Sequence, residues 1–204
     1  MPEALKIRAM VRGDLAAVVA VHCEAFQGFF LTRMGPAFVR SYYQAVLDYP
    51  GSVSLVAANA AGKVTGFVVG FRNPVDFYSH FRSRRMRLAP VILAALIRRP
   101  SLLRDILRNT ARVGAETQGD DGQAGVAELS SIGVASRGGG GGSALLHAFV
   151  QEMRRRGCRA VKLTTDEAEN NAVRAFYNKH GFVETGRESR GRRTLVVYIL
   201  KLDA

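Results

Sequence analysis

The sequence contains no tryptophan, only two cysteines and no apolar run long enough to cross a bilayer. Cys23 and Cys158 lie far apart in the chain, so we expect reduced thiols rather than a disulfide framework. The longest nearly unbroken apolar stretch, Leu88–Ile97, has ten residues, about half of the roughly 20 that a spanning helix needs. The first residues lack the apolar core of a signal peptide. These absences together predict a cytoplasmic protein without a transmembrane segment.

Acidic residues are also scarce, because 17 Asp and Glu stand against 29 Lys and Arg, for a net charge of +12. An excess of this size favours an anionic partner, substrate or cofactor without choosing among them. A nucleic-acid-binding protein is one alternative, but the sequence has no recognition motif and few aromatic residues among its arginines, so we expect no nucleic acid. The 204 residues, 48% of them apolar, predict one compact domain over residues 1–204.

Hydrophobic periodicity predicts an α/β chain that opens β-α-α-β-β and closes with a βαβ unit and a last strand. Asp14 is expected to cap the first helix. The expected strands cover residues 5–10, 53–59, 64–71, 127–134, 159–164 and 195–202, and the expected helices cover residues 15–22, 38–47, 143–156 and 170–179.

The segment Arg72–Val113 is unusually basic, with ten arginines against Asp76 and Asp105. It predicts two helices broken at Arg99-Pro100, followed by a polar loop over residues 114–125. Three interpretations stay open: solvated helix faces that pack their apolar side on the domain, a lid over an anionic acceptor whose phosphates pair with arginine, or a helix that lies on an anionic membrane surface.

Five consecutive glycines, Gly138–Gly142, follow Arg137 and precede Ser143 at the junction of an expected strand and an amphipathic helix. Glycine lets successive backbone N–H groups converge on a phosphate, and the helix start adds unpaired donors and a partial positive charge. The alternative is a flexible linker. A consistent apolar face on the following helix favours the phosphate cradle, and the absence of a following Gly-Lys-Ser or Gly-Lys-Thr excludes a Walker loop.

Two motifs in this half of the chain resemble those of the GNAT superfamily of N-acyltransferases. Arg137, Gly140 and Gly142 match the family's acyl-CoA-binding motif, and Asn170, Tyr177 and Gly181-Phe182 match its second signature. The resemblance implies a single-domain, mixed and mostly antiparallel central sheet flanked by helices, with a βαβ carboxy-terminal half and a helical insertion at about 72–125. It also implies acetyl-CoA as cosubstrate.

The resemblance further assigns roles to individual residues. The backbone of Ile132, Gly133 and Val134 would pair with pantetheine and polarise the acyl carbonyl. Asn170 would hydrogen-bond the cofactor arm, and Tyr177 would act as general acid at the sulfur; the alternative for Tyr177 is a core aromatic residue beside Phe176. The expected cofactor site is completed by Arg137, Gly138, Gly139, Gly140, Gly141, Gly142 and Ser143.

The general base is sought among the acidic residues and histidines. Glu128 begins the strand that enters the acyl site, although it could equally be a solvated charge at the strand end. His22 and His147 are weaker candidates, and Glu24 is a candidate for binding the amine. The four histidines have no metal-ligand spacing, so we expect no metal.

These features together predict an N-acetyltransferase. It would move an acetyl group from acetyl-CoA to a primary amine of a small, phosphorylated or sugar-nucleotide acceptor, by direct attack in a ternary complex. The alternatives are a protein or peptide N-acetyltransferase, and a non-catalytic CoA-binding protein. Peripheral membrane contact and a homodimer both stay open.

Overall fold

The computed structural model describes residues 5–83, 85–98, 100, 125–136, 138–168, 170–190 and 193–202. Its strands are β1 (Lys6–Ala9), β2 (Ser52–Ala58), β3 (Val64–Phe71), β4 (Val126–Val134), β5 (Ala160–Asp166), β6 (Val183–Arg190) and β7 (Arg193–Lys201). Its helices are the 3-10 turn η1 (Arg12–Asp14), α1 (Leu15–Ala25), α2 (Phe30–Arg33), α3 (Pro36–Leu47), α4 (Pro74–Ser83), α5 (Arg85–Arg98), α7 (Gly141–Arg155) and α8 (Asn171–Lys179).

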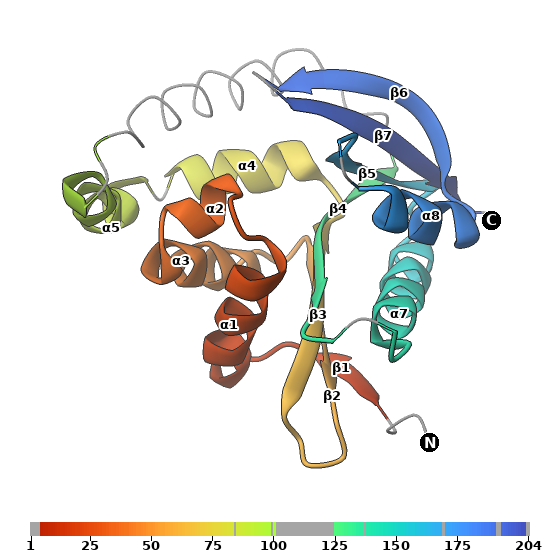
Figure 1. Cartoon of the computed structure of the whole chain (residues 1–204), viewed down its shortest axis with the longest axis horizontal. Helices are drawn as coiled ribbons and strands as arrows, with labels where there is room; N and C mark the ends of the chain where they lie inside the picture. Colours follow the sequence, from red (N-terminus) through yellow and green to blue (C-terminus); the bar gives the residue numbers. More distant parts are fainter. Residues whose placement is uncertain are drawn as a thin grey trace.

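The strands form one seven-stranded sheet in the order β1-β2-β3-β4-β5-β7-β6. Within the described sheet β4 and β5 are parallel, and every other neighbouring pair is antiparallel. The parallel pair is joined by α7, which makes the predicted βαβ unit. Figure 1 shows the first four strands and the last three strands spreading apart from the position where β4 meets β5. The predicted mixed, mostly antiparallel sheet is therefore confirmed.

Helices cover both faces of the sheet and enclose two main cores. α7 lies on one face, where Leu145, Phe149 and Met153 are fully buried against β2, β3 and β4. α1 and α3 lie on the other face, where Val18 and Tyr43 pack against Phe67. Because β3 is covered on both sides, it reads as a continuous apolar run rather than an alternating one.

Two glycines of β3 set how closely α7 approaches the sheet. A Cβ atom at Gly66 would lie 2.9 Å from Val134 Cγ1 and 3.0 Å from Leu145 Cδ1. A Cβ atom at Gly70 would lie 2.5 Å from Phe149 Cζ. Real Cβ atoms do not tolerate such contacts in a close-packed interior. The glycines therefore let the helix after the oligoglycine turn pack directly on the strand beside β4.

Several sequence expectations are corrected here. Strand β6 was missed because its sequence after Val183 is polar and has no apolar alternation; it is an edge strand that pairs on one side with β7. Asp14 does not cap α1 with its side chain. Its carboxylate instead accepts hydrogen bonds from the Val11 N–H at 2.9 Å and from the Arg8 guanidinium at 2.6 and 2.7 Å.

The basic segment also departs from its expected organisation. Two helices, α4 and α5, already lie before the expected break at Arg99-Pro100, since α4 ends at Ser83 and α5 begins at Arg85. The region from residue 101 to residue 124, including most of the expected polar loop, lies outside the described residues. Phe77 of α4 is fully buried against Phe71, and Ala95 of α5 is buried near Phe38. These contacts support the interpretation in which the apolar sides of the helices pack on the domain.

Candidate active site

The parallel strands β4 and β5 pair over only three residues each. The pairs run from Val126 with Ala160 to Glu128 with Lys162. Beyond this point β4 continues to Val134 paired with β3, and β5 continues to Asp166 paired with β7. The facing edges of the two strands therefore carry backbone N–H and C=O groups that the other strand does not bind. Such an opening can accept an extended, amide-containing ligand by strand-like pairing.

Ile132, Gly133 and Val134 all lie on the β4 side of this opening. They pair with Val68, Phe67 and Gly66 of β3, so β3 occupies one edge of the strand and the other edge faces β5. A Cβ atom at Gly133 would be crowded, since it would lie 3.1 Å from Phe67 and 3.3 Å from Phe26. The pairing of the Ile132, Gly133 and Val134 backbone with pantetheine stays a prediction.

A β-bulge in β4 turns two consecutive serines toward helix α3. The register passes from Val69 with Ser131 to Gly70 with Leu129, which leaves Ser130 without a partner on β3. Ser130 Oγ lies 3.0 Å from Tyr42 Oη. Ser131 hydrogen-bonds Tyr43, whose hydroxyl pKa is raised well above its usual value by burial. Burial raises the pKa of Tyr42 as well. The wall on the α3 side of the opening is therefore built of neutral hydroxyl groups.

Glu128 lies at the closed end of the opening, in the last residue pair that joins β4 to β5. It is half-buried, and its Oε1 accepts a hydrogen bond of 2.8 Å from Tyr78 Oη on α4. This bond fixes one carboxylate oxygen from the side of the basic segment. Sequence analysis did not identify Tyr78, because a tyrosine some fifty positions away along the chain carries no local signal that it will reach this strand.

Tyr177 lies in α8, the helix that follows β5, and its side chain is 6% exposed. Its ring packs on Phe182 and Tyr198, with centroids 5.6 and 6.0 Å away. It is thus a core residue, as the alternative interpretation held. Burial also raises the pKa of the Tyr177 hydroxyl, so the group stays protonated at neutral pH and retains the proton that a general acid needs.

The oligoglycine turn lies between β4 and α7, where the sequence placed it. Gly138 and Gly140 have φ values of +87° and +75°, a region that favours glycine. A Cβ atom at Gly138, Gly139 or Gly140 would meet nothing within 4 Å, so the turn is open on its outer side. Gly141 begins α7, whose first N–H groups have no partner within the helix. Arg137 lies outside the described residues.

The two motif regions meet in space. A Cβ atom at Gly142 would lie 3.7 Å from Phe176 Cζ, which places α8 against the first turn of α7. Ser143 Oγ lies 2.9 Å from Nε2 of His180, the residue that ends α8. The motif that carries the glycines and the motif that carries Tyr177 therefore form one continuous region beside the β4–β5 opening.

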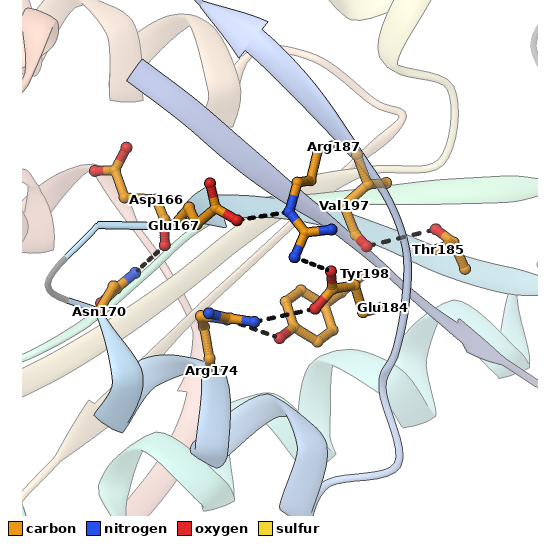
Figure 2. Close-up of polar contacts among 9 residues, drawn as sticks. All are labelled: Asp166, Glu167, Asn170, Arg174, Glu184, Thr185, Arg187, Val197 and Tyr198. Carbon is orange, nitrogen blue, oxygen red and sulfur yellow. Dashed lines mark hydrogen bonds and ion pairs between the residues drawn. The ribbon is translucent and has the colours of Figure 1, made fainter. Parts of the chain in front are cut away.

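Asn170 begins α8 at the open end of β5 (Figure 2). Its Nδ2 donates hydrogen bonds to Thr165 Oγ1 at 2.6 Å and to the carbonyl oxygen of Asp166 at 3.2 Å. The side chain therefore ties the end of β5 to the start of the helix. Its role toward a cofactor stays a prediction.

Ion pairs lock α8 to the last two strands, as Figure 2 shows. Arg174 of α8 donates to Glu184 Oε2 at 3.1 Å and to Tyr198 Oη at 3.4 Å. Arg187 of β6 donates to Glu167 Oε1 at 2.6 Å. Ion pairs this close to solvent add little stability. They fix orientation and neutralise the carboxylate of Glu167, which follows β5.

The mouth of the opening is bridged by a contact between two distant segments. The Arg193 guanidinium at the start of β7 lies 4.4 Å from the ring centroid of Phe29, in the turn after α1. Arg193 also pairs with Asp166 at the end of β5, with Nε donating to Oδ1 at 2.8 Å. Phe29 is 38% exposed. An aromatic ring and a cation thus lie together beside the end of β5.

The weaker candidate residues are dispersed. His22 is 3% exposed and lies behind the opening, with Nδ1 2.7 Å from Tyr43 Oη. Its Nε2 is buried, with no hydrogen-bond partner in the part of the chain that the structure describes. Burial lowers the pKa of His22 to about 4, so it is neutral at physiological pH. Glu24 is exposed on α1 and His147 is exposed on α7. None of these three joins Glu128.

Within the described ranges, no three His, Cys, Asp or Glu side chains gather as a metal site requires. In the same part of the chain, no helix has the length and apolar character to cross a bilayer.

Comparison with known proteins supports one family. The sequence profile of the acetyltransferase (GNAT) family matches residues 106–182. The GCN5-related N-acetyltransferase from Kribbella flavida has a TM-score of 0.64 and 21% identity, over 99% of this chain and 100% of that chain. The ribosomal-protein-alanine N-acetyltransferase from Brucella melitensis has a TM-score of 0.63 and 22% identity, over 97% and 99%. The yncA structure from Salmonella typhimurium, with its cofactor acetyl-CoA, has a TM-score of 0.61 and 19% identity, over 98% of this chain and 95% of that chain. No curated protein matches the chain in sequence.

The matched profile spans β4, the oligoglycine turn, α7, β5 and α8, which are the elements that build the opening. The whole chain shares the fold of these N-acetyltransferase structures. Residues 106–182 thus resemble the acetyltransferase (GNAT) family, and one of the structures that share the fold was solved with its cofactor acetyl-CoA.

Proposed function

We propose that this enzyme transfers an acetyl group from acetyl-CoA to a primary amine of a small, anionic acceptor, by direct attack while both substrates are bound. The observation that carries the proposal is the convergence of the glycine turn, the splayed β4–β5 edge and Tyr177-bearing α8 on one region. This region has unpaired backbone donors at one end and a carboxylate at the other.

The residues present fit acetyl-CoA in three places. The N-terminal turn of α7 and the glycines before it offer N–H groups and a partial positive charge to the diphosphate. The open edge at Ile132, Gly133 and Val134 offers strand-like pairing to the amides of pantetheine. Asn170 stands at the β5 side of the same opening. When bound, acetyl-CoA supplies a thioester whose acyl carbon accepts the amine.

Two side chains of this protein then transfer protons, one as a base and one as an acid. Glu128 accepts one from the attacking amine, directly or through a water, and Tyr78 holds its carboxylate in place. Tyr177, whose buried hydroxyl is protonated at neutral pH, donates a proton to the departing thiolate. Backbone N–H groups on the open edge of β4 polarise the thioester carbonyl.

Charge supports an anionic acceptor. The chain carries +12, and the basic segment, whose helix α4 contacts Glu128 through Tyr78, has a surplus of arginine. Phosphate groups pair well with arginine, whereas a lysine-rich peptide would be repelled. We assign residues 1–204 to one acetyltransferase domain with residues 72–125 as an insertion. We place it in the cytoplasm, where the free Cys23 and Cys158 thiols stay reduced.

A thiol-release assay tests the proposal. Purified enzyme with acetyl-CoA is offered amino sugars, sugar-nucleotide amines, polyamines, amino acids and peptides, and free CoA is measured. We expect release with a phosphorylated or nucleotide-linked amine. If only the peptides are acetylated, the acceptor is a protein or peptide rather than a small molecule. Absence of acetyl-CoA binding by calorimetry would overturn the assignment of the opening as a cofactor site.

A further inference from the structure

A chain of three polar side chains ends at the first turn of α7. Ser143 Oγ lies 2.9 Å from His180 Nε2, and His180 Nδ1 lies 3.0 Å from His147 Nε2. The two imidazole rings are nearly perpendicular, at 85°, with centroids 4.9 Å apart. His147 comes from α7 and His180 from the end of α8. Two titratable groups therefore share one hydrogen bond directly behind the oligoglycine turn.

The surroundings disfavour a proton on His180 in the free protein. The pKa of His180 is lowered by burial, then by His147 and by Lys179 beside it. Phe176 covers the His180 ring at 4.7 Å and is apolar. The titratable and charged groups acting on His180 are thus a second imidazole and a lysine, both of which oppose a positive charge. The start of α7 opposes it too, because its partial charge is positive.

An anion bound at the start of α7 would instead favour the protonated form of the imidazole. A doubly charged phosphate placed on the N–H groups of Gly141, Gly142 and Ser143 would favour the protonated imidazole pair behind Ser143. Ser143 has a hydroxyl that can accept from His180 while donating to a phosphate oxygen. Protonation of the pair and occupation of the turn would then strengthen each other.

We propose that His147 and His180 couple binding of the acetyl-CoA phosphates to uptake of a proton. The inference rests on the proposed cofactor site and adds to it two residues and a pH dependence that neither motif contains. The sign follows from linkage: a ligand that raises the pKa of a group binds more tightly as the pH falls through that range. A rise of one pKa unit corresponds to about a tenfold gain in affinity.

Calorimetry with the full chain tests this. Acetyl-CoA is titrated at about pH 8 and about pH 5.5, each in two buffers of different ionisation enthalpy, which measures the protons taken up. We expect the Kd to fall about tenfold at the lower pH, with net proton uptake. The variants His147→Gln and His180→Gln should lose both effects. His80→Gln, a histidine on α4 that contacts Tyr49, is the matched control and should keep them.

Two further arms separate the possible outcomes. Dephospho-CoA keeps the diphosphate, so an unchanged pH effect assigns the coupling to the diphosphate, and a lost effect assigns it to the 3′-phosphate. Histidine NMR titration of the wild-type chain, with and without CoA, reads the His180 pKa even where a variant folds poorly. If the Kd for acetyl-CoA is the same at both pH values and CoA does not change the His180 pKa, the coupling is overturned. The proposed cofactor site is unaffected by that result. If acetyl-CoA does not bind at either pH, both the coupling and the proposed cofactor site are overturned.

Discussion

Tyr78 Oη donates a 2.8 Å hydrogen bond to Glu128 Oε1, joining the first helix of the basic segment to strand β4 where it borders the β4–β5 opening. This contact makes the carboxylate a fixed group rather than a mobile charge at a strand end. It also means that a segment which the sequence set apart as an insertion takes part in positioning the proposed base.

The first prediction concerns Glu128. Glu128→Gln keeps the size and the hydrogen-bonding shape but removes the base, so we expect kcat to fall about 100-fold with an unchanged Kd for acetyl-CoA. Tyr78→Phe removes only the hydrogen bond to the carboxylate, and kcat should fall about tenfold. Steady-state kinetics and calorimetry measure the two effects. A Glu128→Gln enzyme with normal kcat would show that the proton leaves by another route.

Tyr177 is tested against a neighbour in the same core. Tyr177→Phe should lower kcat about 100-fold while leaving cofactor affinity unchanged, because only the proton donor is removed. Tyr198→Phe is the matched control, since Tyr198 is also buried and its ring lies 6.0 Å from that of Tyr177. Both variants are measured for thermal stability and turnover. Equal losses of turnover in the two would reduce Tyr177 to a packing role.

His22 predicts a stability that depends on pH. Its pKa is lowered to about 4 by burial in the folded state, against about 6.5 when unfolded. Between these values the unfolded chain binds more protons, so stability falls as the pH falls. The loss attributable to His22 is about 3 kcal/mol between about pH 7 and about pH 4. Urea unfolding of wild type and His22→Gln at both pH values measures it; the variant should be less sensitive by that amount, and identical pH dependence would contradict the assignment.

The glycine turn offers a matched pair of alanine substitutions. Gly140 has a φ of +75°, whereas Gly139 is not among the positive-φ positions, and both point into open space. Gly140→Ala should cost about 1 kcal/mol through left-handed strain and weaken acetyl-CoA binding, because the N–H groups would move. Gly139→Ala should keep the wild-type Tm. Thermal melts with calorimetry provide the measurement, and a Gly140→Ala protein that melts and binds like wild type would argue against a rigid turn.

Phe29 predicts an effect on the acceptor alone. Phe29→Leu removes the ring that Arg193 covers at 4.4 Å but keeps an apolar side chain. A cation–π contact at an exposed position is worth about 0.5–1 kcal/mol, so we expect KM for the acceptor to rise a few-fold while KM for acetyl-CoA stays unchanged. A change confined to acetyl-CoA would move the acceptor entrance away from this bridge.

The elements that repeat a strong local pattern were predictable. The hairpin of β2 and β3, strand β4, helix α7 and helix α8 all lie within a few residues of their expected bounds, because apolar periodicity and glycine ends act locally. Gly157, which follows α7, has a φ of +76°, in the left-handed region that favours glycine. Polar strand β6 was not found, since an edge strand needs no apolar repeat and is held by its partner β7.

Some residues of the candidate site could likewise be predicted from the sequence, and others could not. The oligoglycine turn, Asn170 and Tyr177 could be selected from motifs, because their spacing along the chain is fixed by one turn and one helix. Tyr78 on Glu128, Arg193 on Phe29, and His180 on Ser143 could not, because each contact joins elements whose approach depends on how the helices cover the sheet. Residues selected by sequence and residues recruited by packing meet at the same opening.

The amino-acid sequence by itself determined the order of the strands and helices with a strong local pattern, the glycine turn at the head of α7 and the basic character of the chain, since each follows from neighbouring residues. The tertiary structure alone decided that β4 and β5 separate after Glu128, because that depends on β3 and β7 binding their far edges. A strand has two hydrogen-bonding edges, and only its neighbours in space determine which edge is left open.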